Sequence, residues 1–91
     1  MSVIDRIRQA VREKRYRITD HALDEADADN LLEDDIVHIL LTGNLDSTYT
    51  DDPRGTRYVV RGDLYRLEID VVCRFRKDGS LLIVVTVYVV D

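Results

Sequence analysis

The chain has 91 residues, 45% of them hydrophobic, which is enough for one domain with a real core and excludes wholesale disorder. Its net charge of −5, from 13 Lys and Arg against 18 Asp and Glu, opposes non-specific attraction to nucleic acid or to an anionic membrane. The one cysteine excludes an internal disulfide, and the N-terminus has charges where a signal peptide needs an apolar run, so we expect a single cytoplasmic domain over residues 1–91.

The charges are distributed unevenly along the chain. Residues 20–35 hold eight of the eighteen acidic residues, whereas residues 54–77 hold seven of the thirteen Lys and Arg. A chain that is acidic overall can therefore carry one locally basic face. The longest apolar run, residues 81–90, is about half as long as a membrane-spanning helix and is rich in β-branched residues. It predicts a buried strand and no membrane segment.

The first residues show the pattern of a short helix. Ser2 and Asp5 have the spacing of a capping box, and apolar residues then recur at helical intervals. This pattern predicts a helix over residues 3–13. Residues 16–18 are expected to form a short extended segment before the next helix.

Two further helices are indicated before the middle of the chain. Thr19 suits the N-cap of a second helix, which should end near residues 29 and 30. The acidic residues 33–35 favour the first turn of a third helix, and Gly43 is expected to end it.

Beyond Gly43 the apolar residues alternate with polar ones, which is typical of strands. The expected strands are residues 45–49, 56–61, 64–76 and 81–90. The turn signals between them are residues 52–55, Gly62 with Asp63, and a hairpin loop at residues 77–79. Helices followed by strands predict an α+β fold, with two or three N-terminal helices packed on one face of a four-stranded antiparallel sheet.

The short hairpin loop also predicts the register of the last two strands. A three-residue loop places Arg76 opposite Ser80, Asp70 opposite Thr86 and Glu68 opposite Tyr88. These side chains would lie on the face opposite the apolar row that contains Ile69, Val71 and Cys73. We therefore expect a polar patch on one face of the sheet.

Three groups of residues resemble a known family. They are Ile18-Thr19-Asp20-His21-Ala22, then Asp51-Asp52-Pro53-Arg54-Gly55 with Arg57-Tyr58, and finally Val71-Val72 with Thr86-Val87-Tyr88. In this order they are similar to the domain of unknown function 4258 family, over residues 14–89. That family is distantly similar to RelE-like and BrnT-like toxins, which are small endoribonucleases. The resemblance implies a RelE-like or barnase-like architecture, in which one side of the sheet carries the helices and the other binds RNA.

The resemblance also implies a set of site residues. The catalytic candidates are His21, Arg57, Thr86 and Tyr88, and the candidates for contact with RNA are Arg54, Tyr58, Arg66, Arg74 and Arg76. Metal-free cleavage needs a base for the ribose 2′-OH, an acid for the leaving oxygen and a cation for the phosphate. His21, Tyr88 and either Arg57 or Arg74 can fill these roles. Many members of the family have an Arg four residues after the His, where this chain has Glu25, so any phosphate-binding role of that Arg is lost.

Structural interpretations of the same residues remain open. His21 can simply hydrogen-bond the start of its helix, and Thr86 and Tyr88 can simply cover the sheet. The arginines at 66, 74 and 76 can form cross-strand ion pairs with Glu68 and Asp70. Asp27, Asp29 and Asn30 resemble part of a calcium loop, but Asn30 replaces the required Gly, so neither a metal nor a cofactor is expected.

Two hypotheses for the function follow. The first is a toxin-like, metal-independent endoribonuclease, or an inactive relative of one, that acts on single-stranded or ribosome-bound RNA. The alternative is a non-enzymatic module that binds an antitoxin-like or other partner protein, or a second copy of the chain as a homodimer, through its acidic helices or an open sheet edge.

Overall fold

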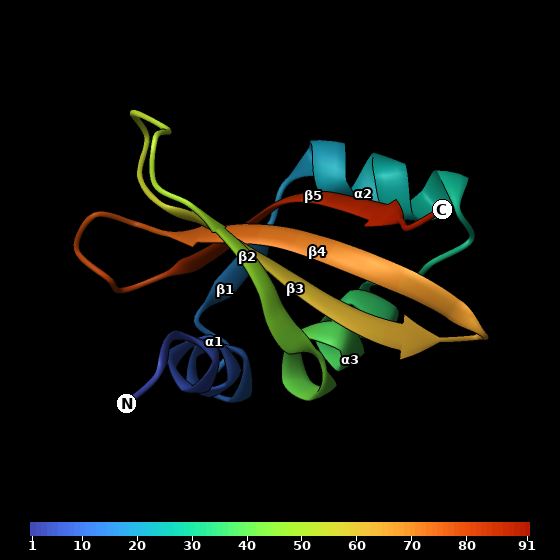
Figure 1. Cartoon of the computed structure of the whole chain (residues 1–91), viewed down its shortest axis with the longest axis horizontal. Coiled ribbons are helices and arrows are strands. Elements are labelled where there is room, and N and C mark those ends of the chain that lie inside the picture. The colour runs from blue at the N-terminus through green and yellow to red at the C-terminus, as the bar shows by residue number, and fades with distance from the viewer.

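The computed structural model describes residues 1–91 and consists of three helices and a five-stranded sheet (Figure 1). The elements in chain order are α1 (Val3–Arg12), β1 (Tyr16–Ile18), α2 (Asp20–Ala28), α3 (Glu33–Thr42), β2 (Asn44–Tyr49), β3 (Arg57–Leu64), β4 (Leu67–Phe75) and β5 (Leu82–Val89). The strands lie in the order β1-β5-β4-β3-β2. The α+β class and all three helices are thus confirmed.

The expectation of a four-stranded, wholly antiparallel sheet is wrong. The extended segment at residues 16–18 pairs with β5 in parallel, with Arg17 opposite Ile83, and becomes a fifth strand. The other neighbouring strands are antiparallel. Two helices and three strands separate β1 from β5 in the chain, so this pairing depends on how the helices pack and leaves no local pattern in the sequence.

The helices begin at the residues that the sequence indicated. Ser2 Oγ accepts a hydrogen bond from the backbone N–H of Asp5 at 3.2 Å, and Thr19 Oγ1 accepts one from Ala22 at 3.2 Å. Each of these bonds satisfies a backbone donor that the first turn of a helix leaves unpaired. The cap at Thr19 fixes the start of α2 and therefore the place of the residue after it, Asp20, and of the histidine that follows.

One core joins the helices to a single face of the sheet. Residues from α1, α2 and α3 pack against Val60 of β3, Val71 and Cys73 of β4, and Leu82 and Val84 of β5. The apolar row predicted for β4 is therefore confirmed at its centre. Burial raises the pKa of the Cys73 thiol to about 12, as expected for a core residue.

The turn expected at Gly62 and Asp63 lies instead at Tyr65 and Arg66. Both of these residues have positive φ, of 54° and 62°, and Leu64 pairs with Leu67 across them. Gly62 instead allows α3 to pack closely on β3, because a Cβ at this position would lie 3.0 Å from the Ile39 side chain of α3. The glycine marks a close approach of helix and strand and not a turn.

The predicted register of β4 and β5 is also wrong. The strands end at the pair Phe75 and Leu82, and a bulge follows between Val72 and Cys73. The observed partners are Asp70 with Tyr88 and Val72 with Thr86. The register is already shifted by one residue at the loop, where Arg74 pairs with Ile83, and the extra residue of the bulge shifts the later pairs by one more.

The loops gather at opposite ends of the sheet (Figure 1). The β2–β3 loop, residues 50–56, and the β4–β5 loop, residues 76–81, project at the left of the view, whereas the Tyr65 turn lies at the right. No helix covers the opposite face of the sheet (Figure 1). Three buried apolar residues on the sheet lie outside the main core: Val59, Val72 and Ile83.

Candidate functional site

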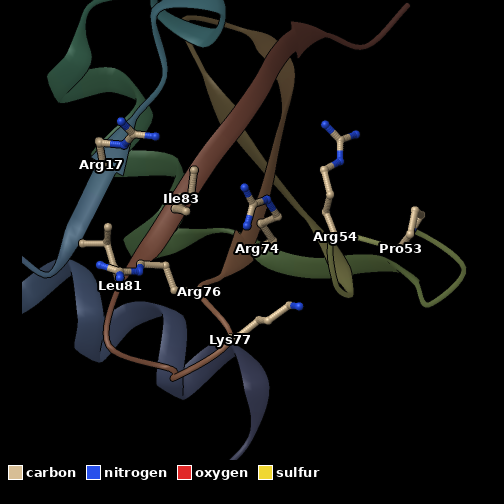
Figure 2. A pocket seen from close by; sticks show the side chains of 8 residues that line it. All are labelled: Arg17, Pro53, Arg54, Arg74, Arg76, Lys77, Leu81 and Ile83. Carbon is tan, nitrogen blue, oxygen red and sulfur yellow. The ribbon is translucent and has the colours of Figure 1, made fainter.

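A cavity of about 720 Å³ lies where the two projecting loops meet β1, β4 and β5 (Figure 2). Its lining residues are Arg17, Pro53, Arg54, Arg74, Arg76, Lys77, Leu81 and Ile83. Five of these eight residues are cations and none is acidic. The basic face expected from the charge distribution therefore exists as a concave surface in a protein whose net charge is −5.

Most of these cations have no anionic partner within the protein. The eight ion pairs of the structure involve none of Arg17, Arg74, Arg76 and Lys77. The two carboxylates that the sequence offered to Arg74 and Arg76, those of Glu68 and Asp70, both lie close to Arg61 instead. The charge of the cavity is therefore free to attract an anion from solution.

A second cavity, of about 360 Å³, adjoins the first and shares Arg54 and Arg74 with it. Its lining residues are Thr19, His21, Asp52, Arg54, Arg57, Arg74, Val85 and Thr86. Of the four catalytic candidates from the sequence, His21, Arg57 and Thr86 lie here together, although they come from α2, β3 and β5. An imidazole, a hydroxyl and several guanidinium groups thus line one hollow.

His21 occupies the first turn of α2, and its side chain is 71% exposed. Its Nε2 lies 3.2 Å from Oε1 of Glu25, one helical turn further on. The same Glu25 oxygen accepts a hydrogen bond of 3.3 Å from the backbone N–H of Val87 in β5. Glu25 thereby connects the histidine to the sheet beyond the point where β1 ends.

Asp52 is the only acid that lines either of the two joined cavities. Its Oδ1 accepts a hydrogen bond of 2.8 Å from the backbone N–H of Arg54, and its Oδ2 lies 3.2 Å from Arg57 Nε. The pKa of this carboxyl lies below its usual value, chiefly because of the bond from the Arg54 backbone. Asp52 therefore carries a negative charge across the neutral pH range.

Three of the nominated residues lie outside both cavities. Tyr58 is on the helix side of the sheet and packs edge-on against Phe75, with ring centroids 6.4 Å apart. Arg66 is in the turn at the far end of the sheet. Tyr88 faces Asp70, and burial and this neighbouring carboxylate both raise the pKa of its hydroxyl.

The side chain of Arg57 also lies over the ring of Tyr49, with Cζ 5.6 Å from the centroid.

The sequence did not point to Arg17, Lys77 or Asp52 as site residues. Arg17 joins the large cavity only because β1 pairs with β5, which Figure 2 shows as two adjacent strands carrying Arg17 and Ile83. Lys77 enters through the β4–β5 loop. The sequence shows the acidic and basic residues of segment 51–57, but it does not show that Asp52 is the acid that pairs with Arg54 and Arg57.

None of the three helices is both long and apolar enough to cross a membrane. No group of three or more His, Cys, Asp or Glu side chains lies close enough together to hold a metal ion.

Comparison with known families gives one match, to the family described as Domain of unknown function (DUF4258), over residues 18–89. The match covers most of the chain, including α2, α3 and all the strands except the first two residues of β1. The protein belongs to this family. A search of curated proteins and a search of solved structures found no match to the chain.

Proposed function

We propose that this chain binds single-stranded RNA in the two joined cavities and cleaves it, without a metal, at the cavity that holds His21. One observation carries the proposal. One cavity is lined by Arg54 and by four cations that form no ion pair, and it continues through Arg54 and Arg74 into another cavity that holds His21, Arg57 and Thr86. A polyanion that carries a hydroxyl able to give up a proton is the natural partner of such a surface.

The structural interpretations of these residues receive less support. Thr19, and not His21, caps α2, so the imidazole is not needed at the start of the helix. Arg61 engages both Glu68 and Asp70, so Arg74 and Arg76 are not consumed in cross-strand ion pairs. Arg74 and Arg76 are therefore available to a phosphate, and His21 keeps one ring nitrogen outside its contact with Glu25.

The proposed reaction is an attack of the ribose on its own phosphate. With Nε2 turned to Glu25, His21 has Nδ1 available to accept the proton of a 2′-OH. The 2′ oxygen forms a bond to phosphorus, the bond from phosphorus to the 5′ oxygen breaks, and the released oxygen takes a proton from the protonated His21 or from water. Arg57 and Arg74 stabilise the extra negative charge on the phosphoryl oxygens. The products are a 2′,3′-cyclic phosphate and a 5′-hydroxyl.

Binding to a fluorescent single-stranded RNA, measured by anisotropy over a range of salt concentrations, tests the first half. The net charge of −5 repels RNA, so we expect weak binding at physiological salt and clear binding at low salt. Arg74→Ala should reduce affinity about tenfold and make the slope of log affinity against log salt shallower by about 0.7. Arg66→Ala is the matched control, because it removes the same charge at the far end of the sheet and should leave affinity within about twofold. Equal effects of the two replacements would contradict the proposed surface.

Cleavage of the same RNA in excess EDTA tests the second half. His21→Ala should abolish formation of the cyclic phosphate while leaving RNA affinity nearly unchanged, because the phosphate contacts of the proposed site come from its arginines. His38→Ala removes the other histidine, which is exposed on α3 outside both cavities, and should leave the rate unchanged. Binding without cleavage by the native chain would eliminate the nuclease reaction and retain RNA binding. No binding would favour a protein partner instead.

A further inference from the structure

Asp52 is in an unexpected place for a residue of an RNA-binding surface. Its carboxylate lines the cavity that holds His21, and its side chain is only 7% exposed. A negative charge beside a phosphate site normally weakens binding, because it repels the phosphate. The position therefore needs a compensating role.

The contacts of Asp52 reveal that role. Oδ1 accepts hydrogen bonds from the backbone N–H of Arg54 at 2.8 Å and from its Nε at 3.4 Å. Oδ2 lies 3.2 Å from Nε of Arg57, which is an ion pair without the geometry of a hydrogen bond. Both arginines thus meet the carboxylate through Nε, so neither ion pair occupies their terminal nitrogens. The two terminal nitrogens of a guanidinium group can together form paired hydrogen bonds to a phosphate.

The two arginines differ in how much the rest of the protein restrains them. The side chain of Arg54 is 78% exposed, and that of Arg57 is 40% exposed and lies over the ring of Tyr49. A long exposed side chain loses much conformational freedom when it is fixed on a ligand, and this loss weakens binding. A buried carboxylate that already holds both guanidinium groups removes part of that loss before RNA arrives.

We propose that Asp52 is a positioning residue for a single phosphate of the RNA backbone. It holds the guanidinium groups of Arg54 and Arg57 next to each other, as a fork whose two arms bind that phosphate together. The inference rests on the proposed function, since it concerns how the same site binds its RNA. The fork stands beside Arg74, which both cavities share, so the phosphate it holds is the one next to His21.

The test compares Asp52→Asn with Asp51→Asn. Asp51 is the preceding residue, is exposed and takes part in none of the ion pairs, so each replacement removes one negative charge from the same loop. Simple electrostatics predicts that both variants bind RNA more tightly. Positioning predicts opposite signs: roughly fivefold weaker binding for Asp52→Asn, and equal or tighter binding for Asp51→Asn. Asn keeps an oxygen for the Arg54 backbone, so the loop is expected to fold, and thermal unfolding checks this.

A second background makes the result specific. When Arg54 and Arg57 are both replaced by Ala, Asp52 has nothing left to position and only repels the phosphate. In that background Asp52→Asn should strengthen RNA binding, which reverses the sign seen in the native chain. A merely structural role for Asp52 would weaken binding in both backgrounds and would overturn the inference. Binding by the native chain together with equal behaviour of Asp51→Asn and Asp52→Asn would overturn it too, while the proposed function would stand. Failure of the native chain to bind RNA would overturn both.

Discussion

Arg61 and Asp70 face each other across β3 and β4 and join through two hydrogen bonds, of 2.7 Å from Nε and 3.0 Å from Nη2. Asp70 is almost fully buried, although it lies on the sheet face that no helix covers. The guanidinium group also lies within 3.9 Å of Glu68 and 3.5 Å of Asp46. Arg61 thus lies close to three carboxylates of the sheet. Arg74 and Arg76 of the cavity form no ion pair with any of them.

The pair is expected to contribute to stability. Asp70→Asn removes the charge that the two hydrogen bonds to Arg61 require, and we expect the free energy of unfolding in urea to fall by about 2 kcal/mol. Glu68→Gln is the matched control, since Glu68 is half exposed and 3.9 Å from the same guanidinium. Its effect should stay below about 1 kcal/mol. A similar loss in both variants would mean that burial of Asp70 does not matter.

The same pair predicts a pH dependence. Hydrogen bonding from Arg61 lowers the pKa of the Asp70 carboxyl below its usual value. A lowered pKa in the folded state means that the stabilisation is complete above the ordinary carboxyl pKa and is lost as the pH falls through the lower, folded value. The difference in unfolding free energy between the native chain and Asp70→Asn should therefore be constant from about pH 6 to 8 and shrink below about pH 4. Urea titrations at each pH measure it, and a difference that grows in acid would contradict the assignment.

The turn at Tyr65 and Arg66 predicts a stabilising replacement. Arg66 has φ of 62°, a left-handed conformation that costs an ordinary residue about 1 kcal/mol and a glycine almost nothing. Arg66→Gly should raise the free energy of unfolding by about 1 kcal/mol. Arg74→Gly makes the same chemical change inside β4, where glycine weakens a strand, and should lower it by a similar amount. Loss of stability in both variants would show that the turn is formed by other residues.

Glu25 should protect the exposed side of β5. Its Oε1 accepts the Val87 N–H at 3.3 Å, on a stretch of β5 that β1 no longer covers. Glu25→Ala should therefore speed hydrogen exchange at the Val87 amide roughly tenfold, whereas Glu25→Gln, which keeps an acceptor oxygen, should change it much less. Asp24→Ala is the control, because Asp24 is exposed on the same helix. Faster exchange across the whole of β5 in Glu25→Ala would indicate a general loss of stability and not the loss of one contact.

Local patterns in the sequence determined the helices, the alternation of the strands and the class of fold. Capping side chains such as Ser2 and Thr19, and apolar residues repeated along α1 and β4, act over a few neighbouring positions, so the sequence displays them directly. The resemblance to the DUF4258 family, and not these local patterns, nominated His21, Arg57 and Thr86, which the fold places in one cavity.

Only the tertiary structure decided the rest, because it depends on pairings between distant residues. The parallel pairing of β1 with β5 brought Arg17 into the same cavity as Arg74, and the longer hairpin loop and the bulge together moved Tyr88 to face Asp70. The choice of Arg61 as partner for Asp70 left Arg74 and Arg76 free. The first two outcomes are backbone pairings between distant segments, and the third is a choice among several arginines for one carboxylate. Only the geometry of the folded sheet settles each of them.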